Sequence, residues 1–276
     1  MKVLVTGADG MLGQDLCSIL EDEDFDVVET DIDNLDVTDL KQVEKVLTAE
    51  KPDYVVHCAA YTNVDKAEED KETAFKLNAD ATKNIVEVCK KIDATLIYIS
   101  TDYVFDGEKG SKYLPDDKTN PINVYGESKL KGEEYVKKYD KSYIVRTSWL
   151  YGHHGKNFVE TMITLKDKEE LKVVDDQIGC PTWTVELANG IVDILLEEAP
   201  YGTYHVCGSG TTSWYGFAKK IFELCGYKVN LKPCKTEEFP RPAKRPKYSA
   251  MENDKICRNW ELSLKEYLEL RCEWKV

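Results

Sequence analysis

The chain has 276 residues, a net charge of −14 at pH 7 and 42% hydrophobic residues. Its length suits one large or two modest domains, and its composition is that of a globular protein with a proper core. The acidic balance disfavours general nucleic-acid binding, because that activity needs many lysines and arginines against phosphates. An anionic substrate is still compatible with this charge wherever basic residues gather locally.

Apolar runs alternate with helical patterns along the first 150 residues. Strands are predicted over residues 2–6, 26–30, 53–59, 94–100 and 142–150, and helices over 11–20, 39–50, 71–91 and 128–139. This alternation predicts a parallel sheet with helices on both faces. The strands are continuous runs rich in Val, Ile and Leu, as expected for a sheet buried on both sides.

Beyond residue 150 the alternation loosens. Helices are predicted over residues 156–170 and 213–226, with shorter strands at 171–174 and 202–206 and a Pro-rich, basic stretch at 231–249. We expect a smaller, mixed α/β substrate-binding lobe built mainly from residues 151–276. The chain is expected to cross back to a first, dinucleotide-binding domain of residues 1–150.

The nine cysteines include no C-x-x-C pair and no spacing typical of a zinc site. Cys17, Cys58, Cys89 and Cys225 lie in apolar patterns and are interpreted as small core residues, with a redox role as the lesser alternative. The chain begins with a predicted strand and shows no basic leader and no long apolar segment. We therefore expect a cytoplasmic protein with reduced thiols.

The turn after the first strand, "VTGADGMLG", contains Gly7, Gly10 and Gly13. Such glycines permit a tight bend and close approach to a pyrophosphate, and the helix N-terminus offers amide donors. A strand before and a helix after favour dinucleotide binding over glycines that serve only a sharp turn. We predict a Rossmann-type, doubly wound sheet whose cofactor contacts Gly7, Gly10, Met11, Leu12 and Gly13.

Asp31 closes the second strand, eighteen residues after Gly13. An acid at this point accepts hydrogen bonds from the adenosine ribose, and Asp33 adds a second negative charge nearby. Because a ribose phosphate would be repelled here, we expect NADH or NADPH with NADH favoured. A solvated turn is the alternative for Asp31, and a helix cap is as good an interpretation of Asp36 as an adenine contact. Three residues after the third strand are also expected to lie against the cofactor, namely Ala59, Ala60 and Tyr61.

Tyr125 and Lys129 stand four positions apart in "YGESK", so a helix would place them on one face. An ammonium near a phenol lowers the phenol pKa, and such a tyrosine passes a proton to or from a carbinol oxygen. The motif alone is also typical of surface pairs. However, Thr101 in "ISTDYVFDG" follows the fourth strand, at the edge where open α/β sheets bind ligands. Thr101 and Tyr125 together predict a hydride-transfer site that binds a carbonyl oxygen.

These motifs belong to a pattern that runs along nearly the whole chain. Its stretches are "GADGMLGQDL", "PDYVVHCAAYTNVDKAE", "STDYVFDG", "NVYGESKLKGE", "RTSWLYG", "NFVETM", "DDQIGCPT", "GTYHV" and "RPKYS". In them the chain resembles the extended short-chain dehydrogenase/reductase family, and within it the dTDP-4-dehydrorhamnose reductases. The resemblance implies NADH- or NADPH-dependent reduction of the 4-keto group of dTDP-4-dehydro-L-rhamnose to dTDP-L-rhamnose. It implies Thr101, Tyr125 and Lys129 as catalytic residues, with the latter two also touching the cofactor.

The resemblance also implies a pocket for a dTDP-4-keto-6-deoxyhexose. The expected substrate contacts are Thr101, Asp102, Tyr103, Trp149, Asn157, Phe158, Gln177, Thr182 and Arg245. Arg245 lies among six basic residues between positions 232 and 247, where a guanidinium can grip a diphosphate. A solvated basic loop is the alternative there, and Trp149 is equally compatible with plain packing. Tyr103 stands where related dehydratases carry an acid used as a base, so water elimination is not expected.

Two other functions fit parts of this pattern. The regulatory subunit of eukaryotic methionine adenosyltransferase resembles the same family without being catalytic, but the intact Thr101, Tyr125 and Lys129 favour an enzyme. A reductase of another nucleotide-linked 4-ketosugar is not distinguished by the sequence. We expect no nucleic-acid or membrane partner and consider a homodimer. We also expect no essential metal, although some relatives bind magnesium through glutamates at a dimer interface.

Overall fold

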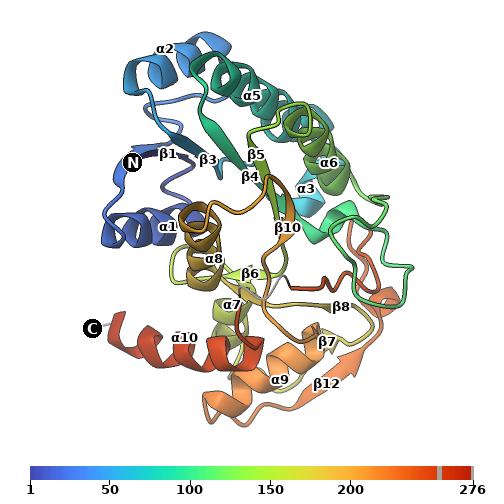
Figure 1. Ribbon diagram of the computed structural model, residues 1–276. Coiled ribbons are helices and arrows are strands. Elements are labelled where there is room, and N and C mark those ends of the chain that lie inside the picture. The colour runs from blue at the N-terminus through green and yellow to red at the C-terminus, as the bar shows by residue number, and fades with distance from the viewer. Residues whose placement is uncertain (254–256, 275–276) are drawn as a thin grey trace.

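A computed structural model of the chain describes residues 1–253 and 257–274 (Figure 1). At its centre lies a six-stranded sheet in which neighbouring strands run parallel. In spatial order the strands are β10 (Gly202–His205), β5 (Ser142–Thr147), β4 (Thr95–Thr101), β3 (Tyr54–His57), β1 (Lys2–Thr6) and β2 (Asp26–Thr30). The predicted parallel sheet is confirmed.

Helices cover both faces of this sheet (Figure 1). One face carries α1 (Met11–Asp22) and α8 (Thr184–Leu196), and the other carries α2 (Leu40–Glu50), α5 (Ala81–Ile92) and α6 (Val124–Val136). Alternate residues of β1 enter the two cores, since Val3 and Val5 pack with α1 and α8 whereas Leu4 packs with α2 and α5. This two-sided burial explains why the strands are continuous apolar runs.

The strand order reverses between β1 and β3. The chain proceeds from β1 to β2 on one side and from β3 to β4 and β5 on the other. A crevice forms at the carboxyl ends of strands beside such a reversal, and ligands bind there. Four predicted segments lie at or just after these strand ends: the glycine turn after β1, Ala59 after β3, Thr101 in β4 and Thr147 in β5. The topology therefore gathers the predicted cofactor and catalytic segments along one edge of the sheet.

Several predicted elements differ in their bounds, among them the helix expected over 128–139, which is α6, and the strand expected over 53–59, which is β3. The helix expected over 71–91 consists of α4 (Lys71–Phe75), the π-helical turn η1 (Lys76–Asp80) and α5, and Asn78 in η1 bonds to Tyr61 and Ser128. The strand expected over 142–150 ends at Thr147, because Trp149 has a φ of 47°, and continues as β6 (Leu150–Tyr151). The helix expected over 156–170 is the shorter α7 (Phe158–Thr164).

The second half also forms short strand pairs around an aromatic core. The pairs are β6 with β9 (Thr182–Trp183), β7 (Leu171–Val174) with β12 (Leu231–Cys234), and β8 (Ile178–Gly179) with β11 (Thr212–Ser213). Together with α7, α9 (Trp214–Leu224) and α10 (Trp260–Trp274) they enclose a core that includes Tyr151, Trp183, Phe217 and Tyr267. The shorter elements α3 (Val64–Glu69), η2 (Asp102–Val104) and η3 (Thr236–Glu238) lie in connections. A domain division near residue 150 stays a prediction.

The four cysteines interpreted as core residues are free thiols in or against apolar cores. Cys17 and Cys89 are buried, and Cys58 and Cys225 are half-buried. Within residues 1–253 and 257–274, no helix combines the length and apolar character needed to cross a membrane.

Candidate active site

A cavity of about 700 Å³ opens at the carboxyl edge of the sheet and reaches residues of the second half. Most of the predicted site residues line it, namely Gly7, Gly10, Met11, Leu12, Gly13, Asp31, Ala59, Ala60, Thr101, Asp102, Tyr103, Tyr125, Lys129 and Trp149. The remaining ones lie outside this lining, namely Asp36, Tyr61, Asn157, Phe158, Gln177, Thr182 and Arg245.

The turn between β1 and α1 is so tight that two of its positions accept only glycine, because a side chain there would collide with backbone atoms. Gly7 has a φ of 70°, and a Cβ on it would lie 2.7 Å from the Ala59 nitrogen. A Cβ on Gly13 would lie 2.2 Å from the Gly7 carbonyl oxygen. The fold itself thus requires both glycines. α1 begins without a side-chain cap and without an acid in its first turn, so its N-terminus is suited to a pyrophosphate.

Asp31 lines the cavity beside three apolar side chains, Ile32, Leu35 and Val37. Its carboxylate accepts the backbone N–H of Asp9 at 3.1 Å and that of Ile32 at 2.7 Å. An oriented carboxylate next to an apolar wall fits ribose hydroxyls beside an adenine ring.

Two predicted cofactor contacts are engaged elsewhere. The Asp36 carboxylate accepts hydrogen bonds from the backbone and hydroxyl of Thr38 at 2.9 and 2.7 Å, in the turn before α2. The cap of α2 is Asp39, so the helix-cap alternative does not apply to Asp36 itself. The backbone of Tyr61 exchanges two hydrogen bonds with the Asn78 amide, and its neighbour Thr62 lines the cavity instead.

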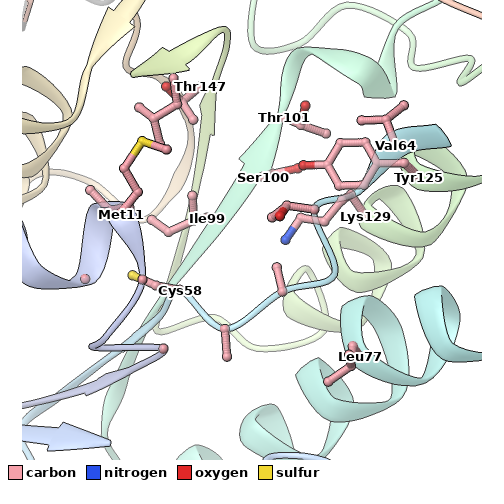
Figure 2. Close-up of a pocket in the computed structure, with 18 of the residues that line it drawn as sticks. Met11, Cys58, Val64, Leu77, Ile99, Ser100, Thr101, Tyr125, Lys129 and Thr147 are labelled. Carbon is pink, nitrogen blue, oxygen red and sulfur yellow. The ribbon is translucent and has the colours of Figure 1, made fainter. Parts of the chain in front are cut away.

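Tyr125 and Lys129 enter the cavity from α6, opposite the end of β4 that carries Thr101 (Figure 2). α6 begins at Asn123, whose side chain accepts the backbone N–H of Gly126 at 2.8 Å. The four-residue spacing then places phenol and ammonium on one helical face. The Thr101 hydroxyl lies close enough to Tyr125 to lower the pKa of its phenol against the effect of burial. The three predicted catalytic residues therefore meet in one place.

Burial controls the charge of these groups. It raises the pKa of Tyr125 to about 12, and the contact with Thr101 opposes this rise. Burial also lowers the pKa of Lys129 to about 7, against the attraction of Glu133. The Lys129 Nζ lies 4.1 Å from the centre of the Tyr98 ring, a cation–π contact. The lowered phenol pKa expected from the sequence is therefore wrong for this structure, and the phenol stays protonated at neutral pH.

Asp102 and Tyr103 follow Thr101 in the turn η2. The Asp102 carboxylate accepts the hydroxyls of Thr101 at 3.1 Å and Ser249 at 2.5 Å, and burial raises its pKa to about 7 against these hydrogen bonds. The Tyr103 ring meets the Tyr125 ring edge-on, with centres 5.9 Å apart and planes at 78°. The Asp102 carboxylate thus orients the Thr101 hydroxyl, and the Tyr103 ring packs beside Tyr125, the predicted acid.

A buried ion pair fixes α6 to the sheet. Glu133, one turn beyond Lys129, accepts two hydrogen bonds from Arg146 at 2.8 and 2.7 Å, and both side chains are at most 1% exposed. Glu133 also accepts the Ser100 hydroxyl at 2.7 Å. A bidentate pair of this kind defines a geometry and is strongly disrupted when one partner is lost. It joins α6 to β4 and β5 behind the cavity.

Two tryptophans line the part of the cavity contributed by the second half. Trp149 and Trp214 stack with ring centres 3.5 Å apart and planes 5° from parallel. Phe158 packs on the same Trp214 ring at 4.6 Å, outside the lining. Lys156 adds a cation to this wall. Trp149 therefore both packs and lines the cavity, so the two alternatives for it are not exclusive.

Three predicted substrate contacts have structural partners within the protein. Asn157 caps α7 by accepting the backbone N–H of Glu160 at 3.0 Å. The Gln177 amide donates to the Thr236 hydroxyl at 3.1 Å. The fully buried Thr182 hydroxyl accepts the backbone N–H of Gly208 at 3.1 Å. A direct substrate contact of any of them stays a prediction.

Arg245 lies near the cavity but forms an ion pair with Asp65 at the start of α3, at 2.5 Å. It is 15% exposed, and its charge lowers the pKa of the Tyr103 phenol against the effect of burial. The sequence suggested a guanidinium that grips a diphosphate, and that role stays a prediction. What the structure shows is a half-buried cation next to the cavity wall.

Comparison with known proteins identifies the family. The family model described as "RmlD substrate binding domain" matches residues 1–271. The chain belongs to this family. A solved dTDP-4-dehydrorhamnose reductase from Clostridium acetobutylicum is 47% identical, with a TM-score of 0.95, and the match covers 98% of this chain and 99% of that one. The Bacillus anthracis enzyme of the same name, solved in complex with NADP, is 42% identical with a TM-score of 0.94, over the same shares.

A further relative of this RmlD-family chain is the spore coat polysaccharide biosynthesis protein SpsK of Bacillus subtilis (strain 168). It is 40% identical over 278 residues, which is 98% of each protein. These matches confirm the family and the fold expected from the sequence motifs.

Sequence reasoning missed several residues that line the cavity of this RmlD-family chain. They are Ile32, Leu35, Val37, Cys58, Thr62, Val64, Leu77, Ile99, Ser100, Thr147, Ser148, Leu150, Lys156 and Trp214. Some had a local signal, since Thr147 and Ser148 end a predicted strand at the same edge as Thr101. Trp214 had none, because it meets Trp149 only through the fold of the second half.

Proposed function

We propose that the chain reduces the 4-keto group of dTDP-4-dehydro-L-rhamnose to give dTDP-L-rhamnose, with NADH or NADPH as reductant. The observation that carries this proposal is the convergence of Thr101, Tyr125 and Lys129 in the cavity that also contains the glycine turn. Family membership and similarity to solved dTDP-4-dehydrorhamnose reductases support the choice of substrate.

The residues present fit a nicotinamide dinucleotide. The uncapped N-terminus of α1 suits its pyrophosphate, Asp31 suits the adenosine ribose, and Lys129 suits the ribose beside the nicotinamide. When bound, the cofactor supplies the hydride that reduces the keto carbon.

The chain's own residues act on the carbonyl oxygen. The Thr101 hydroxyl orients this oxygen beside Tyr125, and the Tyr125 phenol donates its proton as negative charge develops. The raised pKa of Tyr125 keeps that proton in place until it is needed. The Lys129 ammonium then stabilises the tyrosinate left behind. Tyr103 offers no carboxylate to remove a proton from the sugar, so elimination of water is not part of the proposal.

Turnover with a panel of nucleotide-linked 4-ketosugars tests this function. Oxidation of NADH and of NADPH is followed with each sugar, and we expect the highest kcat/KM with dTDP-4-dehydro-L-rhamnose. A higher value with another 4-ketosugar would replace the substrate and keep the chemistry. Tight cofactor binding without turnover of any sugar would instead favour the non-catalytic regulatory function.

We further propose that NADH is preferred, because Asp31 lines the cavity where we expect the adenosine ribose and Asp33 lies close in sequence. The wild type is expected to show the higher kcat/KM with NADH, and Asp31→Ser is expected to shift the ratio toward NADPH by about tenfold or more, as a removed charge repulsion would. Preference for NADPH in the wild type, unchanged in Asp31→Ser, would remove Asp31 from the ribose site.

We also propose a cytoplasmic location, which the free thiols support. The homodimer stays a prediction, and light scattering of the purified chain measures it.

A further inference from the structure

A line of polar contacts leads from the start of α3 to the wall of the cavity. Asp65 in the first turn of α3 accepts the Arg245 Nη1 at 2.5 Å and the backbone N–H of Ala243 at 3.2 Å on one carboxylate oxygen. Its other oxygen accepts the Arg241 Nε at 2.8 Å. Arg245 in turn lies close enough to the Tyr103 hydroxyl to lower the pKa of that phenol against the effect of burial.

Tyr103 is the member of this line that reaches the reaction site. It lines the cavity, its ring meets the Tyr125 ring edge-on, and its backbone N–H donates to the Thr101 hydroxyl at 3.2 Å. Any displacement of Tyr103 therefore changes the surroundings of both groups that handle the carbonyl oxygen.

We propose that Asp65 is a positioning residue for the reduction: it holds the Arg245 guanidinium near the Tyr103 hydroxyl and thereby fixes Tyr103 beside Tyr125. The proposal rests on the proposed reductase function. Asp65 is not among the residues that line the cavity in the described part of the chain, so its effect on the reaction passes through Arg245.

The two guanidiniums on Asp65 differ in a way that supports this role. Arg245 is 15% exposed, whereas Arg241 is 49% exposed. A charge-assisted contact away from solvent fixes geometry well, while a solvent-exposed pair contributes little. Arg241 therefore provides a matched control, because it pairs with the same carboxylate from the exposed side.

The test is a double-mutant cycle between Asp65 and Tyr103, with kcat and KM measured for the sugar. Asp65→Asn keeps the shape of the side chain and removes its charge, so we expect kcat/KM to fall about ten- to a hundredfold. In the Tyr103→Phe background, where the hydroxyl is gone, the same change should cost less than about threefold. Arg241→Ala should lower kcat/KM by less than about threefold. The Kd of NADH should stay the same in every variant.

Additive losses from Asp65→Asn and Tyr103→Phe would overturn the proposal, as would equal losses from Asp65→Asn and Arg241→Ala. Either result would mean that Asp65 only docks the segment 240–245 onto α3. Thermal unfolding checks that each variant is folded, and if Asp65→Asn is not, Asp65→Ser replaces it in the same cycle with the same expectation. A wild type that turns over no ketosugar would overturn the proposed function, and this proposal with it. An active wild type with additive losses overturns this proposal alone.

Discussion

At Tyr125, burial keeps a phenol protonated in the place where an alkoxide would form, with the pKa raised to about 12. Tyr125→Phe keeps the ring and its edge-on packing with Tyr103 but removes the proton. We expect kcat to fall about a hundred- to ten-thousandfold, the usual contribution of general acid catalysis. Calorimetric titration should give nearly unchanged Kd values for NADH and the sugar. A kcat close to that of the wild type would mean that the acid lies elsewhere.

Lys129 carries a stability cost that depends on pH. Burial lowers its pKa from the usual 10.5 to about 7. Below pH 7 the buried ammonium is charged, and the cost of burying it is fully present. Between about pH 7 and 10.5 the unfolded chain binds more protons than the folded one, so the free energy of unfolding increases as pH rises. Lys129→Met should remove this cost, giving an inactive chain that is more stable by roughly 1–4 kcal/mol at pH 6.

Denaturant unfolding at several pH values checks this expectation. The stability advantage of Lys129→Met should shrink steadily as pH rises from 7 toward 10.5. An advantage that is independent of pH, or a variant less stable than the wild type at pH 6, would show that the cation–π contact with Tyr98 outweighs the cost of burial.

At the scale of one element, α6 can hold Tyr125 near Thr101 only because Gly126 lacks a side chain. A Cβ on Gly126 would lie 2.1 Å from the Tyr103 carbonyl oxygen and 3.0 Å from the Pro121 side chain. Gly126→Ala should therefore push α6 away from η2, cost about 1–3 kcal/mol of stability and lower kcat.

Thermal unfolding and steady-state kinetics measure both effects of Gly126→Ala. Lys131→Ala, on the exposed side of the same helix, is the matched control and should change stability by less than about 0.5 kcal/mol. Wild-type kinetics in Gly126→Ala would refute the close approach of α6 to η2.

The sequence predicted a helix in the region of α6 and predicted that Tyr125 and Lys129 lie together, because residues four apart share one face of a helix. It did not predict the π-helical turn η1. That turn occurs where Asn78 bonds to Tyr61 and Ser128, which are 17 and 50 residues away in the chain. Periodicity and propensity report local preferences and do not contain such distant partners.

At the scale of the whole molecule, the cavity has two sides. One side is formed by the carboxyl ends of the parallel strands, and the other includes Trp149 and Trp214, which are far apart in the sequence. The cofactor and catalytic side was predictable, because parallel strands bring their carboxyl ends to one edge. The second-half wall was not, since Trp149 and Trp214 stack across 65 residues of chain, as the numbering shows. The family resemblance named Trp149 but not its partner Trp214, and two other residues that it named, Gln177 and Thr182, have hydrogen-bond partners within the protein.

The central claim is that a hydride passes from the nicotinamide cofactor to C4 of a dTDP-linked ketosugar in this cavity, with Tyr125 as the acid. The most direct measurement uses NADH deuterated at both C4 positions of the nicotinamide, followed by mass spectrometry and NMR of the sugar product. The wild type should produce dTDP-L-rhamnose with deuterium at sugar C4, and Tyr125→Phe should produce almost none in the same time. Deuterium at another sugar position, or unchanged ketosugar and cofactor after incubation with the wild type, would contradict the account.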